Sequence, residues 1–176
     1  CSMGRGSLQH ASELVELIRR TTGDWFQIEV ACYPEFHPQA KTAAADLAHF
    51  KRKVDAGANS ALTQYFYNPD AYFRFLDSCA GLGIKIPIVP GVMPIINSTQ
   101  LIRFSDACGA EIPRWLIKRL LEFGDDARAI RAFGVDVTTA LCERLLAGGA
   151  PGLHLYTMNR YEAADQIWRN LGLPRS

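Results

Sequence analysis

Polar and aromatic residues gather in short segments that follow predicted strands, and the first of these is residues 33–38, with the sequence YPEFHP. The aromatic ring of Tyr33, a carboxylate and the imidazole of His37 stand there beside two prolines. Proline fixes its own backbone φ angle, so this loop would hold its side chains in place for a ligand. An ordinary turn with a surface histidine is the alternative interpretation.

The helix predicted after this loop carries charged groups along one flank. Asp46, His49 and Lys53 are spaced at i, i+3 and i+7, which places them on the same side of a helix. A bound dinucleotide needs an acidic acceptor for its sugar hydroxyls, and cations such as Arg52 and Lys53 for its pyrophosphate. A solvated helix face is the alternative.

Three later segments offer groups that suit a flat heterocycle with an acidic tail. The amide of Gln64 lies in a predicted buried strand, and its donors and acceptor match the edge of a pterin or a nicotinamide carboxamide. Gln100 and Phe104 are spaced i, i+4 on one predicted helix and could face such a ring together. Arg160 is a permanent cation that could pair with a carboxylate. For each residue, contacts within the protein or with solvent are the alternative.

The sequence predicts no metal site and no covalent nucleophile. Its four histidines, at positions 10, 37, 49 and 154, have no ligand spacing to one another or to cysteine. It has neither a nucleophile elbow nor a Walker loop. The pattern therefore indicates binding of small molecules, and no residue is assigned as catalytic.

Alternating strands and helices must position these segments. Apolar residues at helical spacing predict helices over residues 11–20, 42–56, 69–82, 98–108 and 161–171, and a long helical region over 114–147 that is interrupted near Gly124 and Gly134. Runs of β-forming residues predict strands over residues 25–33, 60–67, 86–89, 111–113 and 152–157. Ser12 is expected to cap the start of the first helix, and Gly57 to take a left-handed conformation at the end of the second.

This alternation is typical of βαβ units around a parallel sheet, so the fold class is α/β. A doubly wound sheet usually carries the motif G-x-G-x-x-G after its first strand, and the chain has none. A (β/α)8 TIM barrel is therefore favoured. Because five units cannot close eight strands, we expect an incomplete barrel made of about the last five βα units.

Residues 11–176 are expected to form this C-terminal part of a barrel, and residues 1–10 a Gly/Ser-rich loop or frayed end. The chain opens at Cys1 instead of a methionine, and we expect further residues upstream.

Composition narrows the choice of partners. The chain has 176 residues, 48% of them hydrophobic, and a net charge of +1 with no long run of like charges. A sizeable core is therefore expected, and neither nucleic acid nor a membrane is an expected partner. Five widely spaced cysteines without a C-x-x-C pair favour a reducing cytoplasmic location with free thiols. We expect small-molecule partners and a homo-oligomer.

Several motifs, taken in order, closely resemble methylenetetrahydrofolate reductase. They are residues 33–41 (YPEFHPQAK), Asp46-Leu47, 51–59 (KRKVDAGAN), 63–67 (TQYFY), 90–95 (PGVMPI), Ile112-Pro113 and 154–160 (HLYTMNR). The match spans nearly everything from about residue 10 onward.

The resemblance implies a (β/α)8 barrel that binds FAD and uses NADH or NADPH to reduce 5,10-methylenetetrahydrofolate to 5-methyltetrahydrofolate for methionine synthesis. It also implies a role for each candidate residue. The FAD contacts would be Tyr33, His37, Asp46, His49, Arg52 and Lys53, and the folate and nicotinamide contacts Gln64, Gln100, Phe104 and Arg160. His49 departs from the family, which often has asparagine there, although an imidazole can also donate a hydrogen bond.

Two family features have no counterpart in the chain: a glutamate on the first strand that acts as general acid, and an Arg-Gly-Asp motif after a middle strand. Opening the methylene bridge of the folate requires protonation of its N10 atom. We therefore expect residues 1–176 alone to be inactive and poorly folded. The alternatives are a non-catalytic half-barrel that only binds or pairs, and another flavin barrel such as a relative of proline dehydrogenase.

Overall fold

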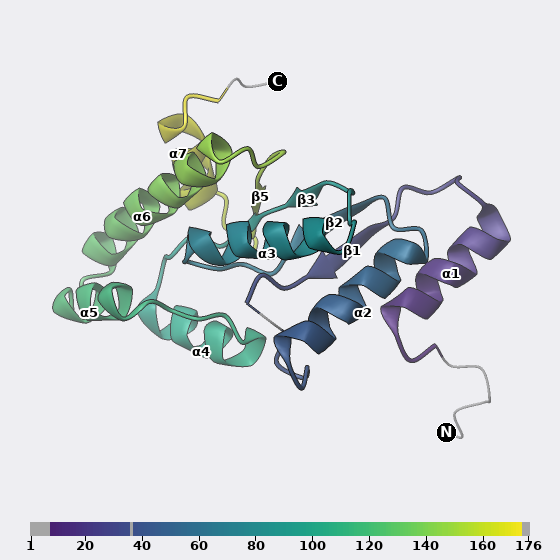
Figure 1. Ribbon diagram of the computed structural model, residues 1–176. Helices are drawn as coiled ribbons and strands as arrows, with labels where there is room; N and C mark the ends of the chain where they lie inside the picture. The colour runs from purple at the N-terminus through teal and green to yellow at the C-terminus, as the bar shows by residue number, and fades with distance from the viewer. Residues whose placement is uncertain (1–7, 36, 174–176) are drawn as a thin grey trace, which may run out of the picture.

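The computed structural model describes residues 8–35 and 37–173, in which helices alternate with short strands (Figure 1). The Gly/Ser-rich residues 2–7 of the expected N-terminal loop lie outside the described residues. The elements, in order, are α1 (Ala11–Thr22), β1 (Glu29–Cys32), α2 (Ala43–Asp55), β2 (Ser60–Thr63), α3 (Pro69–Gly81), β3 (Ile88–Val89), β4 (Gly91–Val92), α4 (Ser98–Cys108), α5 (Arg114–Glu122), α6 (Ala127–Ala147), β5 (His154–Leu155) and α7 (Glu162–Asn170).

All strand pairs are parallel, as the alternation predicts. β1, β2 and β3 form one sheet in that order, and β4 pairs with β5 in a second. β3 and β4 are consecutive on the chain and are separated only by Pro90, which has no N–H group to donate to a ladder. The strands therefore occupy four positions, and the α/β class is confirmed.

The core lies between the strands and the helices that cover them. Val30, Ala61 and Ile88 are neighbours across β1, β2 and β3, and all three are buried. Phe50 of α2 and Phe75 of α3 pack over them, with ring centroids 5.6 Å apart. Burying one such ring contributes about 1.5–3 kcal/mol. In Figure 1, α2 and α1 lie at one end of the fold and α6 and α7 at the other, with α3 between them.

A second apolar cluster lies where α4, α5 and α6 meet the segments that leave β2 and β4. Its buried members are Tyr65, Tyr67, Met93, Ile95, Leu101, Ala110, Leu116, Leu120 and Ile130. Two tyrosine hydroxyls are bonded inside it, since Tyr67 donates to the Met93 carbonyl (3.2 Å) and Tyr65 lies 3.3 Å from the hydroxyl of Ser105. The cluster fixes α4 against the strand ends.

The predicted strand over residues 111–113 is absent, so that prediction is wrong. The N–H of Glu111 donates to the carboxylate of Glu35 at 2.8 Å, instead of to a neighbouring strand. The structure therefore has four strand positions where the sequence predicted five.

The helical region over residues 114–147 is interrupted near Gly124 as predicted, between α5 and α6, but not near Gly134. α6 runs without a break through Gly134. A Cβ atom at this position would lie 1.9 Å from the carbonyl oxygen of Ile95. The glycine therefore permits a close approach between the helix and the segment after β4, and does not end the helix.

Element ends differ from the predictions where side chains take up backbone groups. β1 begins at Glu29, because the N–H of Ile28 donates to the side chain of Asn59 at 2.8 Å. Ser12 does not cap α1, because the helix already begins at Ala11. At this end of the helix, the side chain of Glu13 accepts from the N–H of His10 at 3.2 Å. Gly57 has a φ of +111°, as its expected role requires. The helix predicted over residues 98–108 is confirmed as α4.

Among the residues that the structure describes, none of the helices combines the length and the apolar character needed to cross a bilayer.

We expect Gly134→Ala to lower the free energy of unfolding by about 1–3 kcal/mol, because the added methyl group overlaps the backbone at Ile95. The measurement is thermal and urea unfolding, followed by circular dichroism, of the protein expressed from its complete reading frame. Gly81→Ala is the matched control, since a Cβ at that helical position has no neighbour within 4 Å. It should leave stability unchanged or raise it by about 0.4–1 kcal/mol. Equal stability of the two variants would contradict this account of Gly134.

Candidate functional site

The segments that leave β1, β2, β4 and β5, together with helices α2 and α4, supply the residues singled out by the sequence, at the carboxyl ends of the strands. In parallel α/β folds this is the end at which ligands bind. Two concave regions lie there. We call them the α2 cleft and the α4 pocket, after the helix that lines each.

The α2 cleft has a volume of about 340 Å³, at the lower end of the range for ligand pockets. It lies between the start of α1, the loop after β1 and one flank of α2. It contains five of the six residues predicted to bind a cofactor. Its lining residues are Gln9, His10, Ala11, Ser12, Tyr33, His37, Gln39, Ala40, Asp46, His49 and Lys53.

Hydrogen bonds fix the loop after β1 against α2. The N–H of His37 donates to the carboxylate of Asp46 at 2.9 Å, and the Nδ1 atom of His37 accepts from the N–H of Gln39 at 3.1 Å. A neutral His37 therefore carries its proton on Nε2, which leaves that atom as a donor. The Tyr33 ring meets the imidazole edge-on, with centroids 4.5 Å apart. These contacts hold His37 against Tyr33, Gln39 and Asp46.

Lys53 lies at the inner end of the same flank. Its ammonium group donates to the carbonyl of Ala31 and lies 5.8 Å from the centroid of the Phe50 ring. Partial burial lowers the pKa of Lys53, while the nearby Cys32 and Asp46 act in the opposite direction. The cleft thus holds a half-buried cation close to a carboxylate.

Arg52 does not line the α2 cleft. Its guanidinium instead contacts Nδ1 of His49 at 2.7 Å, on the exposed side of α2. The sequence placed Arg52 next to Lys53, but neighbouring helical residues point about 100° apart.

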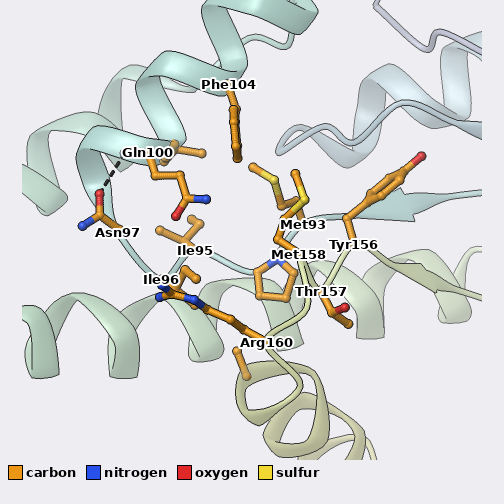
Figure 2. A pocket seen from close by; sticks show the side chains of 13 residues that line it. Met93, Ile95, Ile96, Asn97, Gln100, Phe104, Tyr156, Thr157, Met158 and Arg160 are labelled. Carbon is orange, nitrogen blue, oxygen red and sulfur yellow. Dashed lines mark hydrogen bonds between the residues drawn. The ribbon is translucent and has the colours of Figure 1, made fainter.

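The α4 pocket brings Arg160 together with two residues of α4 that lie far from it in the sequence. Gln100 and Phe104 project from α4, and Arg160 comes from the turn after β5. Figure 2 shows Phe104 and Arg160 at opposite sides of the pocket, with Gln100 between them. Asn97 caps α4 by accepting from the N–H of Gln100 at 2.8 Å. The pocket itself is narrow, with a cavity volume of about 20 Å³.

An unusual backbone turn places Arg160. Met158 and Asn159 have φ angles of +50° and +60°, in the left-handed region that residues other than glycine seldom adopt. The turn closes with a hydrogen bond from the N–H of Arg160 to the carbonyl of Thr157, at 2.9 Å. Such strain is common at ligand sites and persists only where the surroundings enforce it.

Gln64 does not line the α4 pocket. It follows β2 and lines a smaller cavity with Tyr33, Glu35 and Tyr65, between the α2 cleft and α4. Its side-chain oxygen accepts from the N–H of Tyr65 at 3.0 Å. Neighbouring backbone therefore satisfies this oxygen, as the alternative interpretation of Gln64 proposed.

Glu35 is a site residue that the sequence did not single out for a role. Its carboxylate accepts from the N–H of Glu111 at 2.8 Å, which ties the loop after β1 to the segment after α4. Pro38 reinforces the junction, since its ring would lie 2.7 Å from a Cβ at Gly109. Burial raises the pKa of Glu35, and the bond from Glu111 partly offsets this. The partner is 76 residues away, so no local pattern could have revealed it.

The α4 pocket is also lined by Met93, Tyr156 and Met158, which the sequence alone did not single out as site residues. Their position directly after β4 and β5 was the available signal, since strand exits in parallel folds face the ligand.

Among the residues that the structure describes, no cysteine lines the α2 cleft or the α4 pocket. Cys32, Cys79 and Cys142 are buried, and burial raises the pKa of Cys79 and of Cys142 to about 12. They are therefore protonated and poorly reactive at neutral pH. Within residues 8–35 and 37–173, no group of histidine, cysteine and acidic residues is arranged to hold a metal ion.

The family model and the similar curated proteins point to the same family. Residues 2–172 match the family model described as methylenetetrahydrofolate reductase. The chain is 40% identical over 164 residues to 5,10-methylenetetrahydrofolate reductase of Escherichia coli (strain K12), covering 93% of the chain and 55% of that protein. It is 41% identical over 177 residues to methylenetetrahydrofolate reductase (NADH) 1 of Zea mays, covering 96% of the chain and 30% of that protein. The chain thus spans about half of the first relative and less of the second.

A solved structure shares the fold. It is described as an uncharacterized protein from Clostridium thermocellum that binds two copies of 5-methyl-5,6,7,8-tetrahydrofolic acid. The TM-score is 0.62 at 21% identity, with 89% of this chain and 56% of that chain covered. At this identity the likeness establishes the fold alone.

We expect Glu35→Gln to change how stability depends on pH. Because burial raises the folded-state pKa of Glu35, its contribution to stability is complete below the unfolded pKa of about 4.3 and is lost as pH rises through the folded value. Glutamine keeps an oxygen for the Glu111 N–H but cannot ionise. The difference in melting temperature between the variant and the unaltered protein should therefore move in favour of the variant from pH 4 to pH 7.

Glu35→Ala serves as the comparison, because it removes the acceptor as well as the charge. It should be less stable than Glu35→Gln at every pH, by about 1–3 kcal/mol. A pH-independent difference between Glu35→Gln and the unaltered protein would contradict the assignment.

Proposed function

The chain belongs to the methylenetetrahydrofolate reductase family, and we propose that it forms part of an enzyme that reduces 5,10-methylenetetrahydrofolate to 5-methyltetrahydrofolate with NADH or NADPH through bound FAD. The observation that carries the proposal is the α4 pocket. It joins an amide, an aromatic face and a cation, from Gln100, Phe104 and Arg160, at the carboxyl ends of the strands. These three groups match a flat heterocycle with a carboxylate tail.

The lining of the α2 cleft suits FAD. Asp46 supplies an acceptor for sugar or ribityl hydroxyls, His37 a donor on Nε2, and Lys53 a cation for the pyrophosphate. Tyr33 offers an aromatic surface beside them. When bound, the flavin would supply two-electron chemistry by accepting a hydride from the nicotinamide and delivering it to the methylene carbon of the folate.

The protein's own residues bind and orient in this scheme. Phe104 would stack on the ring of the folate or the nicotinamide, and Gln100 would hydrogen-bond its polar edge. Arg160 would pair with a carboxylate of the folate. Gln64, in the cavity between the α2 cleft and α4, keeps its amide nitrogen available for the same ligands, and Arg52 would act from the rim of the cleft.

We propose further that a complete (β/α)8 barrel contains these strands. β1 has one strand partner among the described residues, and along it Glu29 and Ala31 are exposed while Val30 and Cys32 are buried. Additional strands would cover the exposed face and pair with the free edge of β1. A homo-oligomer and a cytoplasmic location stay predictions.

A non-catalytic half-barrel is the second candidate. A protein of this kind would bind folate in the α4 pocket without turnover.

We expect Lys53→Ala to weaken FAD binding by roughly 10–100-fold, the effect of losing one hydrogen bond to a charged group. The measurement is titration of the apoprotein, expressed from its complete reading frame, followed by flavin fluorescence. Lys51→Ala is the matched control, because Lys51 lies on the same helix and pairs with Asp55 outside the cleft. Equal losses from both variants would contradict the placement of FAD in the α2 cleft.

We expect residues 1–176 alone to show no reductase activity, because they hold no counterpart of the glutamate that protonates folate N10 in the family. The measurement is an assay of NADH or NADPH oxidation. The protein from its complete reading frame should oxidise the nucleotide in a way that depends on 5,10-methylenetetrahydrofolate. Turnover by residues 1–176 alone would overturn this expectation. Folate binding without turnover in the complete protein would support the non-catalytic candidate instead.

A further inference from the structure

Helix α5 buries one side and leaves large apolar side chains exposed on the other. Leu116 and Leu120 are buried in the apolar cluster beneath α4. Trp115 is 55% exposed and Leu121 is 70% exposed, and Lys118 is exposed between them. The spacing of three residues places Trp115, Lys118 and Leu121 on the same side of the helix, which we call the outer face of α5. An apolar surface rimmed by charged residues is typical of a protein interface.

The charges at the two ends of α5 run against the helix dipole. Arg114 is the first residue of the helix and Glu122 is the last. The start of a helix carries partial positive charge and its end partial negative charge, so both residues destabilise an isolated helix. Arg119 offsets part of this by pairing with Glu122 at 2.6 Å. Within the described residues, Arg114 has no ion-pair partner. Such a helix is suited to a neighbour that runs antiparallel to it, because the acidic end of the neighbour would meet Arg114.

We propose that the outer face of α5 is an interface between two copies of this chain, in which the α5 helices pack antiparallel across a two-fold axis. In such a contact the same surface is used by both copies, so each residue pair occurs twice. With the axis at Lys118, Trp115 faces Leu121 of the second copy, and Arg114 faces Glu122 of the second copy. The inference does not depend on the proposed reaction, and it gives the expected homo-oligomer a surface.

Lys118 is the residue that opposes this arrangement, because the two copies of its ammonium group lie near the axis. The side chain has a flexible four-carbon stem, which can cover apolar surface while the ammonium group stays in water. Glu122 lies one helical turn away on the same helix and reduces the local positive charge. The repulsion at the axis is therefore weaker than the attraction gained at both ends.

A second copy fits the outer face better than another part of the same chain does. In Figure 1, α5 lies at the end of the fold occupied by α6, whereas β1 lies toward α1 and α2. The free edge of β1 is where we expect further strands of the barrel. The cationic start and the acidic end that must match each other are both present on α5. A second copy therefore supplies the complementary surface by itself.

The size of α5 limits the strength of this contact. The helix has nine residues and is therefore about 13 Å long. A pair of helices of this length buries less than the roughly 1,000 Å² that a stable protein interface requires. We therefore expect a dimer that dissociates in the micromolar range, so its population depends on protein concentration.

The test measures the dissociation constant of the dimer by sedimentation equilibrium, with the protein expressed from its complete reading frame. Leu121→Gln removes the apolar contact, and Arg114→Glu and Glu122→Arg each reverse one charge. The double variant with both reversals exchanges the two charges. Leu82→Gln is the matched control, since Leu82 is 44% exposed at the end of α3, away from the outer face of α5.

We expect Leu121→Gln to weaken the dimer on the order of tenfold or more, because the leucine contact is lost twice. Each single charge reversal should also weaken it on the order of tenfold, because like charges then meet at both ends. The double variant should regain most of the affinity, since it restores opposite charges across the axis. Leu82→Gln should match the unaltered protein. Measured on the monomers at low concentration, all the proteins should melt at about the same temperature.

Several results would overturn the inference. One is an unaltered protein that stays monomeric throughout the micromolar range, and another is an assembly that Leu121→Gln leaves unchanged. A double variant as weak as the single reversals would contradict the antiparallel arrangement. A large fall in the melting temperature of Leu121→Gln alone would show that another part of the same chain covers α5. None of these results bears on the proposed reductase function, which is tested by FAD binding and turnover.

Discussion

The close approach of the chain at the ends of β2, β4 and β5, around Gly91, is the constraint on which the α4 pocket depends. A Cβ atom at this residue would lie 2.2 Å from the Thr63 carbonyl oxygen and 2.7 Å from the ring of Tyr156. The N–H of Gly91 donates to the buried hydroxyl of Thr63 at 2.8 Å, and the hydroxyl of Tyr156 donates to the Thr63 carbonyl at 3.1 Å. The ends of β2, β4 and β5 are thereby locked together, and Gln64 and the turn that carries Arg160 start from this junction.

A similar close approach fixes the position of α4. Gly134 lets α6 approach the backbone of Ile95, and this contact fixes the segment between β4 and α4 against α6. Asn97 then begins α4 with a side-chain cap, which fixes the direction in which Gln100 and Phe104 project. The pocket is therefore positioned by backbone packing as well as by the apolar cluster, in which Met93 and Ile95 are buried and against which Phe104 packs.

Charge is distributed unevenly between the two concave regions. The α2 cleft pairs a half-buried cation, Lys53, with the carboxylate of Asp46, while Arg160 is the one charged side chain among the described residues that line the α4 pocket. Between them, Glu35 binds the backbone of Glu111 and joins the loop of the first region to the helix of the second. In the proposed reaction a cofactor and a substrate must meet, and this junction keeps their binding regions at a fixed separation.

The sequence by itself determined what depends on near neighbours. Helical spacing gave the bounds of α4 and put Gln100 and Phe104 on one face, and the positive φ of Gly57 followed from its place after a helix. The order of motifs indicated the family, which the comparisons then established.

Tertiary structure alone decided what depends on distant segments. The strand expected at residues 111–113 does not form, because the N–H of Glu111 donates to the carboxylate of Glu35. Gly134 lies inside a helix, where it permits the close approach of Ile95. Tertiary structure also brought Arg160 into one pocket with Gln100 and Phe104. Periodicity constrains residues within a few turns of one another, whereas these contacts join positions brought together only when the core packs.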